Sequence, residues 1–453
     1  MTISDLIPRA PRRPRRAASS SRAARGLGRG FAAMRHRNYR LYWFGQIGSL
    51  TGAWMQSVAQ PWLVLELGGS PLELGLVLAL MFAPSMFLAP IGGVLADRVD
   101  KRRTLMVLNA FAMLQAGTLF ALAGTGVVEI WHVYLLALAA GFVNAIEMPV
   151  RQAFAAELVP AEDLVNAIAL NSTSFNLSRV VGPAIAGLTI AAFGVAINFG
   201  INAVSYLSVL IGLWMLDGRV LLHIKRPERF PSVRSSLAEG LRYALATPTV
   251  LWPLVLLGGM AMLAMNFQTL LPLFSRDTLA LDSGGYGALF AAMGAGSLLG
   301  SLILAFGTSQ RPMLRFMLGG GAVFLALELA LGFVRSPLLA FPLVIGIGLA
   351  SMLMVNTINV TIQNSVPDAL RGRVMSLYVT VFAGTAPLGG LLAGAIAQGF
   401  GAPVAISVGA GMAVTILALV AWRLRAVRMP LAAGVAAEAA TADRPERVVR
   451  RAA

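Results

Sequence analysis

Three charged residues inside long apolar stretches suggest chemistry that moves protons or anions. Glu147 and Arg151 stand four residues apart, which puts them on one face of a helix. Arg179 stands in the next apolar stretch, four residues before Pro183. A carboxylate in a partly desolvated cavity can gain and lose a proton. We therefore interpret Glu147, Arg151 and Arg179 as a proton-coupling set. An ion pair that only anchors a helix end is the alternative for the first two.

A charged Arg179 side chain inside an apolar stretch costs free energy, so we expect it to have a partner. An arginine at the centre of a membrane helix costs about 3 kcal/mol unless it faces the protein interior. Pro183 lacks an N–H, and its ring displaces the carbonyl of Arg179, which predicts a kink. Three partners remain open: Glu147, an anionic group on a substrate, or local polar cover from Ser172, Asn176 and Gln56 or Gln60.

The elements that position these residues are membrane-spanning helices. Of the 453 residues, 57% are hydrophobic and 12% are charged, whereas about a quarter of a soluble domain is charged. Apolar runs of about 20 residues, long enough to cross a bilayer, recur throughout the chain. They predict an all-α membrane protein with helices at 40–66, 72–97, 104–126, 131–155, 164–194, 196–217, 248–276, 284–307, 313–334, 337–364, 371–401 and 402–424.

The net charge of +16 is explained by topology. Most of the 36 lysines and arginines fall in the tails and in alternate connections between the predicted helices, whereas Arg276 and Arg335 stand on the other side. The positive-inside rule places the basic side, with both termini, in the cytoplasm. We expect a multi-pass protein of the inner membrane that contacts anionic lipids and no nucleic acid. With no cysteine and three histidines, we expect no metal and no cofactor.

An internal repeat divides the chain into two halves. Val159-Pro160 recurs as Val366-Pro367, and Gly182 and Gly187 recur as Gly389 and Gly394, each 207 residues later. Parallel repeats of this kind place a substrate site at their interface near the bilayer midplane. The predicted organisation is a basic tail (1–39), a six-helix bundle (40–217), a cytoplasmic linker (218–247), a second bundle (248–424) and a second tail (425–453).

A motif follows the second predicted helix and reads "GGVLADRVDKRRTL". It resembles the loop signature of the major facilitator superfamily at Gly93, Leu95, Ala96, Asp97, Arg98, Lys101, Arg102 and Leu105, and Asp100 stands where that signature has glycine. The resemblance implies two six-helix bundles. It also implies a cytoplasmic gate, in which Asp97 meets the start of the eleventh helix, formed by Gly93, Asp97, Arg98, Lys101, Arg102, Arg371 and Arg373.

The segments "MPVRQAF", "LVNAIALNSTSFNLSRVVGPAIAGL" and "INAVSYL" resemble the enterobactin exporters and related secretion transporters. Within the second segment, Gly182, Pro183 and Gly187 match the helix-kink signature of superfamily antiporters, which favours export. The resemblance implies that the first, fourth, seventh and tenth helices line the cavity. We expect a substrate cavity formed by Gln56, Gln60, Asn144, Asn176, Arg179, Asn266, Gln268, Asn356 and Asn359, and interhelical hydrogen bonding is the alternative for each.

These observations predict a secondary transporter and no enzyme. The expected function is proton-coupled efflux of amphipathic small molecules, siderophore-like or drug-like, by alternating access, with the proton gradient as energy source and a monomer as the working unit. The sequence lacks the phosphate-binding loop of an ATP-driven pump. Uptake and lysophospholipid translocation by the same fold are the alternatives. Glu328 is also intramembrane, and we rank it below Glu147 as a proton carrier because the ninth helix should be peripheral in this fold.

Overall fold

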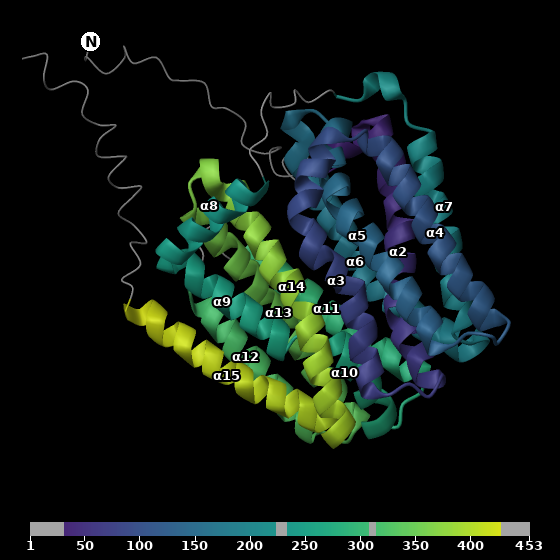
Figure 1. The fold of residues 1–453 in the computed structure, drawn as a ribbon, viewed down its shortest axis with the longest axis vertical. Helices are drawn as coiled ribbons and strands as arrows, with labels where there is room; N and C mark the ends of the chain where they lie inside the picture. The colour runs from purple at the N-terminus through teal and green to yellow at the C-terminus, as the bar shows by residue number, and fades with distance from the viewer. Residues whose placement is uncertain (1–30, 223–232, 308–313, 427–453) are drawn as a thin grey trace, which may run out of the picture.

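The computed structural model describes residues 31–222, 233–307 and 314–426, without the side chains of 89–98, 233–237, 305–307, 368–369 and 426. Figure 1 shows two helical bundles joined by a linker. The N-terminal bundle contains η2 (Ala32–Arg35), α2 (Arg37–Glu66), α3 (Pro71–Arg98), α4 (Lys101–Gly124), α5 (Ile130–Leu158), α6 (Ala161–Phe193) and α7 (Ala196–Trp214). The linker contains η3 (Gly218–Val220) and α8 (Val233–Ala246). The C-terminal bundle contains α9 (Pro248–Leu263), α10 (Phe267–Leu273), the π-helical turn η4 (Phe274–Thr278), α11 (Ser283–Gly307), α12 (Leu314–Phe333), α13 (Pro337–Ser365), α14 (Asp368–Phe400) and α15 (Ala402–Ala426).

The described helices confirm the all-α membrane architecture. Eleven segments of the described chain are long and apolar enough to cross a membrane, with α9, α10 and η4 counted together. α2, 30 residues long, completes the set of twelve, and its polar side chains lower its hydropathy. Large apolar side chains such as Phe333 and Leu338 are 79% and 81% exposed, as expected of a surface that faces lipid.

The prediction of one continuous helix over 248–276 is wrong, because the helix is interrupted between Leu263 and Phe267. The Asn266 side chain donates to the Met262 carbonyl (2.8 Å), which a continuous helix would use for the Asn266 N–H. Two successive N–H groups, of residues 264 and 265, both donate to the Met260 carbonyl. The other predicted helix ends lie within about three residues of the observed ones.

The two bundles pack closely against each other near one end of the molecule. We call the end where α2 begins and α15 ends the termini-bearing end, and the opposite end the far end. Near the far end, Gly187 of α6 meets Gly287 of α11 so closely that a Cβ on Gly187 would lie 2.9 Å from the Gly287 Cα. Gly75 of α3 similarly abuts Gly390 of α14. Only glycine allows two helix backbones to approach this closely.

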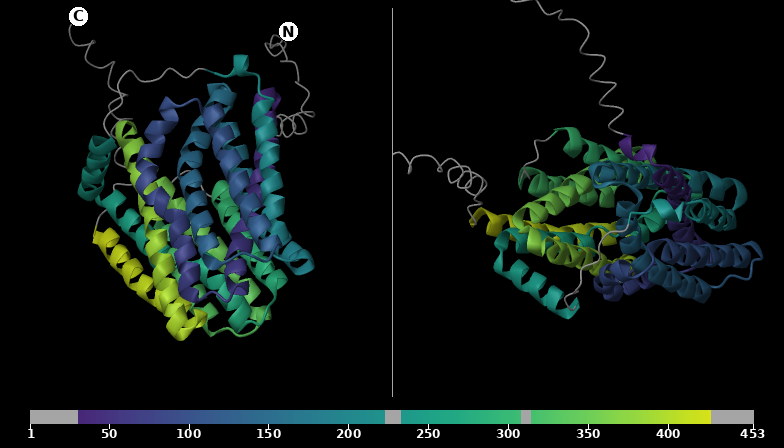
Figure 2. Two further views of the ribbon diagram at one scale, coloured as in Figure 1. Left: turned by 45° about the vertical axis from the view of Figure 1, so that its right-hand side comes forward. Right: turned by 90° about the horizontal axis from the view of Figure 1, so that it is seen from above.

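Side chains reinforce this far-end contact between the bundles. The rings of Trp62 and Tyr286 stack with centroids 5.6 Å apart. The Arg276 Nη1 donates to the Leu65 carbonyl at 3.1 Å. The view turned by 45° in Figure 2 shows the helices of the two bundles converging toward this end. We conclude that the far end is closed in this conformation.

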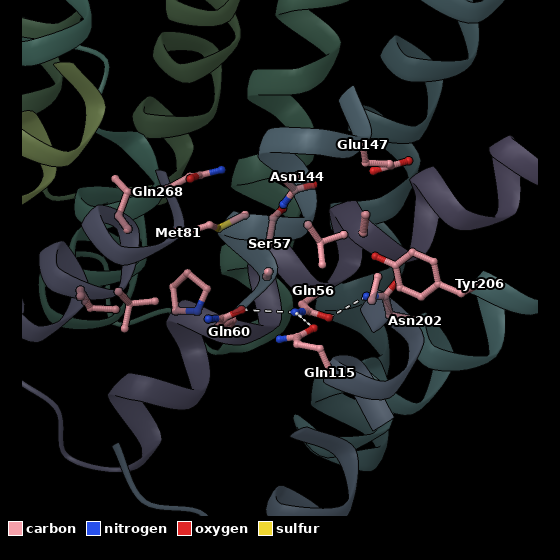
Figure 3. A pocket seen from close by; sticks show the side chains of 18 residues that line it. Gln56, Ser57, Gln60, Met81, Gln115, Asn144, Glu147, Asn202, Tyr206 and Gln268 are labelled. Atoms are coloured by element: carbon pink, nitrogen blue, oxygen red, sulfur yellow. Dashed lines mark hydrogen bonds between the residues drawn. The ribbon is translucent and has the colours of Figure 1, made fainter. Parts of the chain in front are cut away.

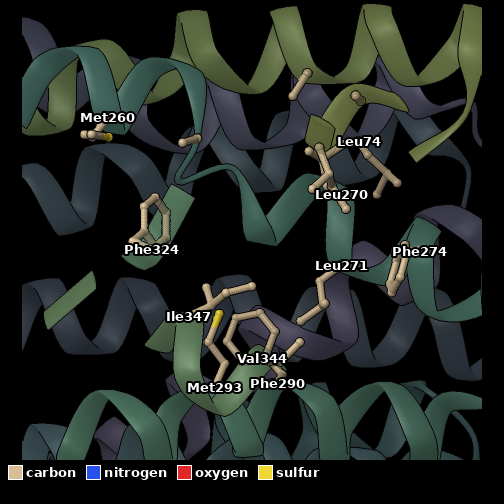
Figure 4. Close-up of a cluster of buried hydrophobic side chains, with 14 of the residues drawn as sticks. Leu74, Met260, Leu270, Leu271, Phe274, Phe290, Met293, Phe324, Val344 and Ile347 are labelled. Atoms are coloured by element: carbon tan, nitrogen blue, oxygen red, sulfur yellow. The ribbon is translucent and has the colours of Figure 1, made fainter. Parts of the chain in front are cut away.

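Buried apolar side chains fill the C-terminal bundle and extend to the other bundle. In Figure 4, Leu74 of α3 lies near Leu270 of α10, and Phe290, Met293, Val344 and Ile347 form a second group. All six are less than one-tenth exposed. This packing holds α10 between the two bundles, beside the pocket described next.

Candidate functional site

A polar pocket opens inside the N-terminal bundle and faces α10 of the other bundle (Figure 3). The space that a water molecule can occupy in it is about 80 Å³, enough for several waters at about 10–15 Å³ each. Five of the side chains expected in the cavity or in proton coupling line it: Gln56, Gln60, Asn144, Glu147 and Gln268. The structure adds four polar residues that the sequence interpretation missed: Ser57, Gln115, Asn202 and Tyr206.

A chain of amide hydrogen bonds forms the floor of the pocket. Asn202 Nδ2 donates to Gln56 Oε1 at 2.6 Å. Gln56 Nε2 in turn donates to the Oε1 atoms of Gln60 (3.3 Å) and Gln115 (3.2 Å). Gln60 Nε2 has no partner among the described atoms. A buried donor without a partner costs about 1–3 kcal/mol, so this nitrogen is suited to bind water or a substrate acceptor.

The amide chain predicts an effect on stability. We expect Gln56→Ala to lower the free energy of unfolding by about 1–3 kcal/mol, because it removes the hydrogen-bond partners of Asn202 Nδ2 and Gln115 Oε1. Gln268→Ala is the matched control, since Gln268 lines the same pocket outside the amide chain. Thermal unfolding in detergent compares the two. Equal losses of stability would show that the amide chain contributes nothing of its own.

Glu147 lies near the mouth of the pocket, close to a cation on its own helix. Its carboxylate is 3.8 Å from Arg151 Nη1, and the two side chains are 15% and 24% exposed. A strong charge-assisted pair is about 2.8 Å long, so this pair is loose. Tyr42 and Tyr206 interact electrostatically with both charges. The Glu147 carboxylate is therefore partly buried, borders a pocket that can hold water, and is only loosely paired with Arg151.

Arg179 lies at the interface between the bundles, away from the pocket. Its guanidinium is 5.8 Å from the centre of the Trp54 ring, and its Nη1 is 3.8 Å from the Met352 sulfur of α13. The Nε atom has no hydrogen-bond partner, and no ion pair to Arg179 occurs, within the described part of the chain.

The partners considered for Arg179 are engaged elsewhere. Glu147 faces Arg151, Asn176 donates to the Ser172 carbonyl of its own helix, and the two glutamines belong to the amide chain. The Arg179 carbonyl, which Pro183 leaves without its usual donor, abuts Gly294 of α11. α6 is continuous through Pro183.

The remaining residues expected in the cavity bond to neighbouring helices or to their own helix. Asn266 donates to the Met262 carbonyl, and Asn356 donates to the Ser301 hydroxyl of α11 at 3.3 Å. Asn359 accepts from Gln363 at 2.6 Å. Of these bonds, the one from Asn356 joins two helices, as the alternative interpretation expects. None of the three lines the pocket.

The basic residues expected at the gate bond within their own bundle or to the linker. Lys101 pairs with Glu157 (2.5 Å), Arg102 donates to the Leu213 and Trp214 carbonyls (2.8 Å each), and Arg373 pairs with Glu239 of α8 (2.5 Å). Arg371 donates to the Gln363 carbonyl. Gly93, Asp97 and Arg98 belong to the end of α3 whose side chains lie outside the described part of the structure.

Asp100, the departure from the superfamily motif, has a local structural role. Its side chain accepts a hydrogen bond from the Arg103 N–H at 3.0 Å, and it is the N-cap of α4. An aspartate at an N-cap satisfies one of the free N–H groups of the first turn. Within the described residues, no group of three histidine, aspartate or glutamate side chains could hold a metal ion.

Solved structures share this arrangement of helices. The nucleoside transporter NupG matches with a TM-score of 0.64 over 86% of this chain and 98% of that chain, at 14% identity. A bacterial homologue of the human lysosomal transporter Spinster, inward-facing and occupied, matches with a TM-score of 0.68 over 86% and 97%, at 14% identity. At these identities the likeness shows the fold alone, which is that of a major facilitator transporter.

The family model of the transmembrane secretion effectors matches residues 28–447, so the chain belongs to this family of transporters. The enterobactin exporter EntS of Shigella boydii serotype 18 is 29% identical over 380 residues, which is 81% of this chain and 89% of the exporter. The MFS-type transporter YfiS of Bacillus subtilis, described as uncharacterized, is 29% identical over 205 residues. That match spans 45% of this chain and about half (48%) of YfiS.

Proposed function

We propose that the protein exports amphipathic small molecules that carry an anionic group, in exchange for protons. One observation carries the proposal: a titratable carboxylate, Glu147, borders a polar pocket, while an interface arginine, Arg179, has no carboxylate partner in the described chain. The first can carry a proton, and the second can attract an anion. The relationship to the enterobactin exporters supports export over uptake.

The proposed cycle begins in the conformation described here, with the far end closed. The basic connections favour the cytoplasm as the side of the termini-bearing end, so substrate enters from the cytoplasm. Its anionic group would bind Arg179 in place of the Met352 sulfur, while its apolar part would pack on Trp54. The far end then opens, substrate leaves, and a proton from outside binds Glu147. Protonation weakens the Glu147–Arg151 pair and favours return to the first conformation, in which Glu147 releases the proton to the cytoplasm.

The close glycine contact at the far end provides a test of this alternation. We expect Gly287→Leu to hold the far end open, because any side chain there would meet the Gly187 backbone at less than 3 Å. The chain has no cysteine, so a single cysteine at Ser283 reports far-end access by its rate of thiol labelling. Gly411→Leu is the control, since nothing lies within 4 Å of a Cβ at that position. Unchanged labelling in Gly287→Leu would contradict the proposed opening.

Inverted membrane vesicles with an acidic interior test the proposed activity. Siderophores, cationic drugs, anionic drugs and lysophospholipids are added in turn, and a pH-sensitive dye reports collapse of the gradient. We expect collapse by compounds that pair an anionic group with an apolar body. Collapse by lysophospholipids alone would favour lipid translocation. Accumulation of the compounds inside intact cells would favour uptake.

A further inference from the structure

Glu328 is a second buried carboxyl, which the cycle above does not use. It lies on α12 and is 1% exposed, and its Oε2 has no hydrogen-bond partner among the described atoms. α12 therefore turns Glu328 toward the bundle interior. A charged carboxylate without a partner in such surroundings costs several kcal/mol.

Nothing packed against α12 in the described chain supplies a cation. α13 has no charged residue at all, and the described part of α15 has only Arg423 and Arg425, at the termini-bearing end. Arg423 lies over the rings of Trp252 and Trp422, 5.4 and 4.7 Å from their centres. α9, α10 and α11 carry no titratable side chain except Tyr286 of α11. Glu328 therefore holds a proton in this conformation.

The face of α12 that carries Glu328 contacts side chains on both sides of the break between α9 and α10. Gly321, Phe324 and Glu328 are spaced three and four residues apart, so they share one face. A Cβ on Gly321 would lie 3.6 Å from Met260, which precedes the interruption. Phe324 packs on Phe267, the first residue of α10, with ring centres 6.2 Å apart. Figure 4 shows Phe324 beside this break.

The interrupted helix connects this region to the pocket and to the far-end contact. α10 begins with Phe267 and carries Gln268, which lines the pocket. α10 leads directly into η4, where Arg276 bonds to the Leu65 carbonyl of the other bundle. Broken helices in transporters serve as moving parts beside ion sites. A charge that appeared on Glu328 would have to draw in water or move α10, and either change would disturb the far-end contact.

We propose that Glu328 is a second proton-binding site, which keeps its proton while the far end is closed and exchanges it with the far-side solution when that end opens. This proposal rests on the alternation described under the proposed function, and it requires no particular substrate. The site binds a proton, and its protonation is coupled to the helix interruption between α9 and α10.

Far-end accessibility as a function of pH tests this site without any substrate. A single cysteine at Ser283, which is 7% exposed at the start of α11, is labelled with a thiol reagent between pH 6 and pH 9. The same cysteine in Glu328→Gln corrects for thiol ionisation, so the ratio of the two rates is the readout. We expect this ratio to rise by about tenfold across the range, because deprotonation of Glu328 shifts the population toward the open far end.

Two more variants keep the outcome clear. Glu328→Met is neutral and of similar size, and it replaces Glu328→Gln if that variant does not fold. Glu162→Gln should keep the pH dependence, because Glu162 is an exposed acid in the first turn of α6, outside the pocket and the interface. A ratio that stays constant with pH would overturn the proposal, as would a pH dependence that is lost in Glu162→Gln. Failure to transport any compound would count against the proposed function and leave this labelling result unaffected.

Discussion

Glu147→Gln is expected to abolish proton-driven transport while leaving substrate exchange intact. Glutamine keeps the shape of the side chain and can still accept from Arg151, now 3.8 Å from the carboxylate, but it cannot bind and release a proton. Substrate-induced collapse of a pH gradient should fall to the rate of empty vesicles. Exchange of labelled for unlabelled substrate across the same membrane needs no net proton movement, so it should continue.

Glu162→Gln is the matched control for this variant. Glu162 is an exposed acid in the first turn of α6, and its loss should change neither measurement. If Glu147→Gln kept full gradient-driven transport, the role of Glu147 would be limited to stabilising the end of α5 through its ion pair with Arg151. Loss of both gradient collapse and exchange would instead indicate a binding or folding role.

Arg179→Gln is expected to discriminate between substrates by charge. Removing one partner of a desolvated charge pair costs about 2–5 kcal/mol, so binding of an anionic substrate should weaken by about 30-fold or more. Neutral compounds of the same size should bind nearly unchanged, because Trp54 and Met352 remain in place. Inhibition of labelled-substrate exchange by paired anionic and neutral analogues measures the difference.

Arg423→Gln is the control for the loss of an arginine. Arg423 also lies over tryptophan rings, but it is near the end of α15 and does not line the pocket. Its loss should weaken neither analogue. Equal weakening of both analogues by Arg179→Gln would mean that Arg179 supports the structure of the interface and does not bind the anion.

The helices could be predicted from the sequence because the signal comes from each segment alone. A run of about 20 apolar residues crosses the bilayer whatever its neighbours are. The basic residues in alternate connections predicted the same set of membrane-spanning helices. The interruption at Asn266 could not be predicted in this way. It depends on one side chain taking the Met262 carbonyl from the backbone, and an asparagine in an apolar stretch fits a continuous helix equally well.

The candidate site was predictable only in part, for a related reason. Gln56, Gln60 and Glu147 are polar groups in apolar stretches, and this signal indicates an interior position. Gln115 and Asn202 carry the same signal, but their role depends on α4 and α7 meeting Gln56 across the bundle. The pairing of distant helices is a property of packing. A polar residue in an isolated segment does not show which partner it meets.

The most direct test of the central claim uses purified protein in proteoliposomes with no imposed pH gradient. A gradient of a compound identified in the vesicle panel is then applied across the membrane, and internal pH is recorded. Exchange of substrate for protons predicts that protons move opposite to the compound, so vesicles loaded with it become acidic inside as it leaves. Proton movement in the same direction as the compound, or none, would contradict the account.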